Sequence, residues 1–158
     1  MTEVKQEYFH KELILAPMRA ESAEDAITQL GALLQKGGFV RESFVPAVIK
    51  REKEFATGLP TAEVGVAIPH TDVEHVLKPA IAVGVLEKPV EFVEMGNPEG
   101  RVQVQIVCLL AIPEPDKVIP MLQSLVRMFQ SPPVLHQIAN SRSAAEIIDV
   151  FHQHCQVE

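Results

Sequence analysis

A histidine near the middle of the sequence follows directly on an apolar segment. Residues 64–68 are Val-Gly-Val-Ala-Ile, Pro69 closes this segment, and His70 comes next. Proline fixes its own φ and restricts the preceding residue to extended geometry. We therefore expect His70 at the end of a strand, on a backbone with little conformational freedom. A neutral imidazole nitrogen can attack phosphorus while the other ring nitrogen is held by a hydrogen bond. His70 can therefore form a phosphohistidine, which makes phosphoryl transfer a candidate chemistry for this segment.

Phosphoryl transfer needs hydrogen-bond donors around the phosphoryl oxygens. An arginine guanidinium matches those oxygens in geometry, and Arg51 falls on the core-facing stripe of the helix expected before the histidine segment. The hydroxyl of Thr71 and backbone N–H groups after Pro69 are further candidate donors. We expect Arg51 to stabilise the phosphoryl group and Thr71 to add a donor.

Other interpretations of the same residues stay open. A histidine at a strand end is usually a surface residue or a hydrogen-bonded core residue, and the charged run 50–54 around Arg51 has the pattern of a solvated helix face. A metal-dependent hydrolase is another alternative, because His70, Asp72 and His75 are ligand types close together in sequence. Two histidines five residues apart do not share a helical face, which weighs against that metal site.

The remaining sequence must build the scaffold that positions these side chains. Short apolar runs predict four strands, and the first of them ends at Pro17. These strands are expected at residues 12–16, 64–68, 80–86 and 102–112.

Helices are predicted between and after these strands. Ser22 begins one that Gly37 ends, and a second covers residues 42–55. A third carries the apolar residues of 118–129, and a fourth follows the capping residue Ser143. The order strand, two helices, three strands, helices predicts an α/β fold: a three-layer α/β/α single domain with a mixed β-sheet. It should span residues 1–158, with residues 1–11 loosely ordered.

The composition narrows the classes of function. The net charge of -7 and the absence of a basic stripe weigh against nucleic acid as a partner. No apolar run is long enough for membrane insertion, and the N-terminus lacks a signal-peptide pattern, so a cytoplasmic location is expected. The two cysteines suggest neither a disulfide framework nor a zinc site. We expect no cofactor and no metal.

Several motifs together resemble a known family. They are Lys-Arg-Glu at 50–52, Thr-Gly at 57–58, Gly-Val-Ala-Ile-Pro-His at 65–70 and Ser-Ala-Ala-Glu-Ile-Ile at 143–148, with an apolar pattern at 122–129 between the last two. The chain resembles, over nearly its whole length, the enzyme IIA component of the phosphoenolpyruvate-dependent sugar phosphotransferase system, in the fructose and mannitol superfamily (type 2).

The resemblance implies a phosphotransferase component that forms a phosphohistidine. His70 matches the histidine that accepts a phosphoryl group from the phosphocarrier HPr and passes it to a cysteine of a IIB component, and Arg51 matches an arginine beside it. The membrane component IIC would be an indirect partner. Docking to these proteins is expected on an apolar patch around His70, with Leu59, Val73 and Val76 as candidates.

The branch of the family is a finer prediction. The chain most resembles the galactitol-specific branch, in which a second histidine follows five residues after the first, as His75 does here. Galactitol or a related sugar is therefore the expected substrate of the system. Many members carry another active-site histidine where Val118 stands here, and we hypothesise that His75 substitutes for it. The alternatives are a solvated loop histidine at position 75 and, for the whole chain, a regulatory IIA-like signalling module of the same fold.

Overall fold

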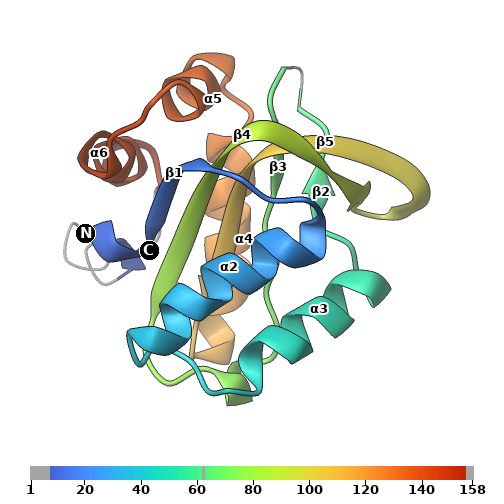
Figure 1. Cartoon of the computed structure of the whole chain (residues 1–158), viewed down its shortest axis with the longest axis vertical. Coiled ribbons are helices and arrows are strands. Elements are labelled where there is room, and N and C mark those ends of the chain that lie inside the picture. Colours follow the sequence, from blue (N-terminus) through green and yellow to red (C-terminus); the bar gives the residue numbers. More distant parts are fainter. Residues whose placement is uncertain (1–7, 62, 156–158) are drawn as a thin grey trace.

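The computed structural model describes residues 8–61 and 63–155, and its elements form a mixed sheet with helices on both faces (Figure 1). The strands are β1 (Ile14–Met18), β2 (Gly58–Leu59), β3 (Gly65–Ala67), β4 (Ala80–Glu94) and β5 (Asn97–Ala111). The helices are η1 (Lys11–Leu13), α2 (Ala23–Lys36), α3 (Phe44–Glu54), η2 (Val73–His75), α4 (Pro115–Met128), α5 (Pro132–Ala139) and α6 (Ala144–His154).

The sheet is built around the long antiparallel hairpin of β4 and β5. β1 pairs in parallel with β4, and β3 pairs in parallel with β5. The short β2 runs antiparallel to β3 and also meets the far end of β4, where Gly58 lies opposite Glu94. The tip of the hairpin therefore curls back to the strands that lead to His70.

Two apolar cores cover the two faces of this sheet. Alternate residues of β4 point to opposite faces: Ile81 and Val83 join the core under α4, α5 and α6, whereas Ala80 and Ala82 join the core under α2 and α3. Figure 1 shows α2 and α3 together on one side of the sheet and α4 on the other. The predicted three-layer α/β/α arrangement with a mixed sheet is confirmed.

The first strand was predicted to end at Pro17, but it does not. β1 continues to Met18, and Pro17 lies exposed inside it. Among the strands that the structure describes, β1 pairs only with β4, so it is an edge strand, where a residue without an N–H is tolerated. The register shifts between Leu15 and Met18, which absorbs the proline.

The central hairpin is longer than expected. The prediction ended one strand at Leu86 and began the next at Val102, and it left out the run Glu87, Lys88 and Pro89, which is exposed. β4 instead passes through this run with a register shift between Val85 and Val90 and resumes its inward-facing pattern. The short strand β2 was not predicted at all.

The four predicted helices are present as α2, α3, α4 and α6, and α3 differs from the prediction at its end. Ser22 caps α2, its side chain accepting from the backbone N–H of Asp25 at 3.0 Å, and Ser143 caps α6 in the same way. The apolar stripe of α3 is buried at Phe44 and Val48, but Phe55, the residue after the helix, is 60% exposed. The stripe therefore stops at Arg51.

The N-terminal segment was expected to be loosely ordered over residues 1–11. Residues 1–7 lie outside the described residues, but for the rest the expectation is wrong. Tyr8 and Phe9 are buried, and the ring of Phe9 stacks on Phe151 of α6 with centroids 4.7 Å apart. Within residues 8–61 and 63–155, no helix has the length and apolarity to cross a membrane.

Candidate functional site

The strand β3 ends three residues before His70. Ile68 is fully buried, and the carbonyl oxygen of Pro69 accepts from the backbone N–H of Leu110 in β5 at 3.1 Å. Proline has no N–H to extend the pairing, so the chain leaves the sheet here. His70 therefore stands, half-buried, just beyond the last sheet contact, as the sequence predicted.

The imidazole of His70 is fixed through one of its nitrogens. Its Nδ1 lies 2.9 Å from the carbonyl oxygen of Ile68. A carbonyl oxygen can only accept, so Nδ1 carries the proton, and in the neutral ring Nε2 keeps a free lone pair. The two residues that make this bond are separated only by Pro69, so the orientation of the ring is set by the local backbone.

The surroundings favour the neutral form of this histidine. Burial lowers the pKa of His70, the hydrogen bond to Ile68 raises it, the charge of Arg51 lowers it again and that of Asp72 raises it, with a net shift downward. At pH 7 the neutral, nucleophilic form is therefore more populated than in an unperturbed histidine.

Arg51 reaches the same place from the last turn of α3. Its Nη1 is 3.9 Å from Oδ1 of Asp72, and its guanidinium lies over the ring of Phe55, 5.2 Å from the centroid. Its Nε is buried and has no hydrogen-bond partner within the described part of the chain. The side chain as a whole is 37% exposed, so solvent reaches the guanidinium although it does not reach Nε.

Two residues that were given no role in the sequence analysis also connect to the site. Glu52 accepts from both the backbone N–H and the hydroxyl of Thr57, at 2.8 and 2.9 Å. The Thr57 hydroxyl oxygen in turn accepts from the backbone N–H of Ile68 at 3.2 Å. Burial raises the pKa of Glu52 to about 7, although both Thr57 bonds lower it. Both residues lie in the motifs at 50–52 and 57–58, but charge pattern alone had assigned Glu52 to a solvated face.

The second candidate histidine, His75, contacts the start of α3 rather than the end that carries Arg51. His75 of η2 has its Nδ1 2.8 Å from the hydroxyl of Ser43, which precedes the first residue of α3. Eight residues of helix at 1.5 Å each separate Ser43 from Arg51 by about 12 Å. The contact of His75 thus ties η2 to the start of α3, at the end of that helix opposite Arg51.

Three further predictions concern Thr71, Val118 and the metal site. Thr71 is half-buried next to His70, and Val118, in the first turn of α4, packs against the core of the C-terminal helices. The metal site of His70, Asp72 and His75 is not formed: within the described residues, no three His, Cys, Asp or Glu side chains group as metal ligands. The predicted metal site is therefore wrong, and the Nδ1 of His75 lies against Ser43 instead.

The expected apolar patch is displaced. Val76 is buried in the core, and Leu59 and Val73 are only half-exposed. A groove of about 480 Å³ instead runs from Ile68 along α4, with two exposed apolar side chains on it. These are Met95 at the hairpin tip, 41% exposed, and Ile119 of α4, 59% exposed. We call this feature the α4 groove.

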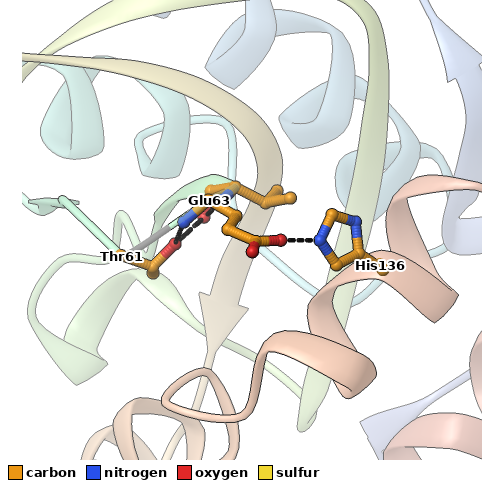
Figure 2. A network of polar contacts seen from close by, with 4 residues as sticks. Thr61, Glu63 and His136 are labelled. Carbon is orange, nitrogen blue, oxygen red and sulfur yellow. Dashed lines mark hydrogen bonds and ion pairs between the residues drawn. The ribbon is translucent and has the colours of Figure 1, made fainter.

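The segment between β2 and β3 is held from the other side. Figure 2 shows the carboxylate of Glu63 directed at the imidazole of His136 in α5, with which it forms a close ion pair. Thr61 closes the turn, its hydroxyl oxygen accepting from the backbone N–H of Val64 at 3.0 Å. Both members of the ion pair are half-exposed, so the contact adds little stability but joins this segment to α5.

The sequence and the fold match known proteins. Residues 7–154 match the sequence model of the family described as "Phosphoenolpyruvate-dependent sugar phosphotransferase system, EIIA 2". The galactitol-specific EIIA component of Escherichia coli (strain K12) is 26% identical over 114 residues, 72% of this chain and 75% of the relative. The solved complex of enzyme IIA mannitol and phosphorylated enzyme IIB mannitol from Escherichia coli matches with a TM-score of 0.75 and 26% identity, covering 92% of this chain and 97% of that one.

Other relatives are longer proteins. The "Probable licABCH operon regulator" of Bacillus subtilis (strain 168) is 31% identical over 150 residues, which are 92% of this chain. The chain spans 22% of that relative, and 15% and 23% of two further curated relatives from the same organism. These relatives thus share one segment with this chain, and most of their length lies outside the match.

Proposed function

Because this chain belongs to the EIIA type 2 family of the phosphoenolpyruvate-dependent sugar phosphotransferase system, we propose that it carries a phosphoryl group on His70. The donor is the phosphorylated form of HPr, and the acceptor is the cysteine of a IIB component. In this proposal Arg51 stabilises the phosphoryl oxygens.

One observation carries the choice of atom. The bond from Nδ1–H of His70 to the Ile68 carbonyl leaves the lone pair at Nε2, so Nε2 is the nucleophile. Its lone pair forms the new N–P bond while the N–P bond of phospho-HPr breaks and its electron pair returns to the donor's imidazole. The proton on Nδ1 stays in place throughout. In the second transfer, the IIB thiolate forms an S–P bond and the electron pair of the breaking N–P bond returns to Nε2.

The α4 groove is the proposed docking surface for both partners. Its lining includes Ile68, two residues before His70 in the sequence, and its exposed apolar side chains Met95 and Ile119 come from the hairpin tip and from α4. Exposed apolar side chains close to a reactive group are typical of transient protein contacts. The solved complex of an enzyme IIA with its phosphorylated enzyme IIB supports a IIB partner.

The sugar and the cellular location belong to the same proposal. The likeness to the galactitol-specific EIIA component supports galactitol or a related sugar as the substrate of the system. The membrane component IIC would then be met only indirectly, through IIB. A carrier that works between HPr and IIB acts in the cytoplasm.

The test of this proposal is direct phosphorylation. The protein is incubated with phosphoenolpyruvate, enzyme I and HPr, and its intact mass and the acid stability of the adduct are measured. We expect one acid-labile phosphoryl group on the wild type and none on His70→Gln, with His136→Gln as the matched histidine control that is labelled like the wild type. Labelling of His70→Gln would overturn the assignment.

A second candidate function is regulatory rather than transport-linked. The observation that favours it is the 31% identity to a protein named as an operon regulator. Both candidates share phosphorylation of His70 and differ in the next step. Transfer of the phosphoryl group to the cysteine of a purified galactitol-type IIB, followed by mass, supports transport, whereas a stable phospho-His70 in the presence of IIB supports regulation.

A further inference from the structure

The backbone of Ile68 is anchored on both sides of the carbonyl that His70 uses. Ile68 follows the last residue of β3, so its N–H donates to the hydroxyl of Thr57 at 3.2 Å in place of a partner strand. On the other side, the carbonyl of Pro69 is held by Leu110. The Ile68 carbonyl lies between these two anchors and accepts from Nδ1 of His70.

The anchor on the Thr57 side depends on a carboxylate. A hydroxyl has one hydrogen, and that of Thr57 is directed to Oε1 of Glu52 at 2.9 Å, which leaves a lone pair for the N–H of Ile68. The backbone N–H of Thr57 donates to Oε2 of Glu52 at 2.8 Å. Thr57 is 4% exposed, so these bonds form away from solvent, where an unmade hydrogen bond is costly.

We propose that Glu52 and Thr57 are positioning residues, which fix the Ile68 carbonyl and through it hold His70 as the Nδ1–H tautomer with Nε2 directed outward. The proposal rests on the proposed function of His70 and deepens it. Three hydrogen bonds make the link: the Thr57 hydroxyl donates to Glu52, the Ile68 N–H donates to the Thr57 hydroxyl oxygen, and Nδ1–H of His70 donates to the Ile68 carbonyl. Because Glu52 and Thr57 act through Ile68, they are not catalytic residues.

The chemistry of the pair makes it sensitive to conservative change. Both oxygens of the Glu52 carboxylate accept, so the ionised form satisfies both donors of Thr57, whereas a glutamine would present an N–H₂ group to one of them. Valine at position 57 keeps the shape of threonine but removes the hydroxyl, and serine keeps the hydroxyl. Because the pKa of Glu52 is raised to about 7, experiments at pH 8 keep the carboxylate ionised.

The first measurement needs no phosphoryl donor. The tautomer of His70 in the unphosphorylated full chain is read from the ¹⁵N shifts of its imidazole at pH 8. We expect the Nδ1–H tautomer in the wild type, a mixture of tautomers in Thr57→Val and Glu52→Gln, and recovery of the single tautomer in Thr57→Ser. The matched controls Thr28→Val and Glu54→Gln change exposed side chains on α2 and α3 and should leave the tautomer unchanged.

The second measurement is the rate of phosphoryl transfer from phospho-HPr to His70 in the same variants. We expect at least a tenfold loss of kcat in Thr57→Val with little change in KM, and a rate within threefold of the wild type in Thr57→Ser. A folded Thr57→Val with the wild-type tautomer overturns the proposal, even if its rate is low. If Thr57→Val does not fold, Glu52→Gln is judged by the same criterion. A wild type with the Nδ1–H tautomer that HPr does not phosphorylate would instead overturn the proposed function alone.

Discussion

At the scale of single residues, the site combines a held nucleophile, His70, with a loosely paired donor, Arg51. The contact of Arg51 with Asp72 is long, at 3.9 Å, and both side chains reach solvent. Such a pair contributes little to stability, so Arg51 can turn to an arriving phosphoryl group without a large loss of other contacts. Asp72 and Arg51 have opposite effects on the pKa of His70.

Arg51→Met is therefore expected to slow the phosphorylation of His70. We predict a fall in kcat of about 10²-fold, the usual effect of removing one transition-state donor, and partial recovery in Arg51→Lys, which keeps the charge but not the fork. Because the charge of Arg51 lowers the pKa of His70, the same substitution should raise that pKa in an NMR titration. Lys50→Met, on an exposed neighbour, is the control, and a wild-type rate in Arg51→Met would contradict the role.

Much of this site could be predicted from the sequence, and the remainder depends on contacts that a sequence does not display. The position of His70 at the end of a strand depends only on its neighbour Pro69, and helical spacing places Arg51 on the core-facing stripe of its helix. Glu52 was missed because a charged run usually marks a solvated face, and only the fold shows Thr57 covering its carboxylate. His75 is close to His70 in sequence, but the turn of η2 directs it to Ser43.

At the scale of elements, the α4 groove depends on the curl of the hairpin. Met95 at its tip is held by a bond from its N–H to the carbonyl of Gly58 at 2.8 Å, next to β3. The outer halves of β4 and β5 were not predicted, because β4 crosses a polar, proline-containing run in its middle through an irregularity in pairing. The buried halves of β4 and β5 were predictable, since continuous apolar runs mark strands covered on both faces.

Ile119→Glu tests the α4 groove as a docking surface. A charge on this exposed apolar residue should raise the KM for phospho-HPr about tenfold, which corresponds to about 1.4 kcal/mol of lost binding, and leave kcat unchanged. Leu77→Glu is the matched control, because Leu77 is also exposed but does not line the groove. Equal KM values for Ile119→Glu and the wild type would argue against docking there.

At the scale of the whole molecule, one sheet serves two cores, which supports our proposal that the chain acts as a single domain. The core under α4, α5 and α6 also includes the first described residues, Tyr8 and Phe9. This packing was not predicted, because the segment has no regular period and its partner Phe151 lies at the far end of the sequence. Long-range contacts of this kind are visible only in the folded chain.

Phe9→Ala should therefore destabilise the protein. Phe9 is 5% exposed and stacked on Phe151, so we predict a loss of about 3 to 4 kcal/mol in the free energy of unfolding, measured with urea. Phe55→Ala removes the same ring from a site that is 60% exposed and should cost less than about 1 kcal/mol. Similar losses in both variants would mean that the Phe9 stack is not part of the core.

The stack of Phe9 on Phe151 also has an evolutionary consequence. It brings the two ends of the described fold side by side, as Figure 1 shows. A domain whose two ends lie close together can be inserted into a longer protein without distorting the fold of either one. Such portability suits a segment that matches less than a quarter of the length of three relatives, two named as regulators and one as a fructose-specific EIIABC component.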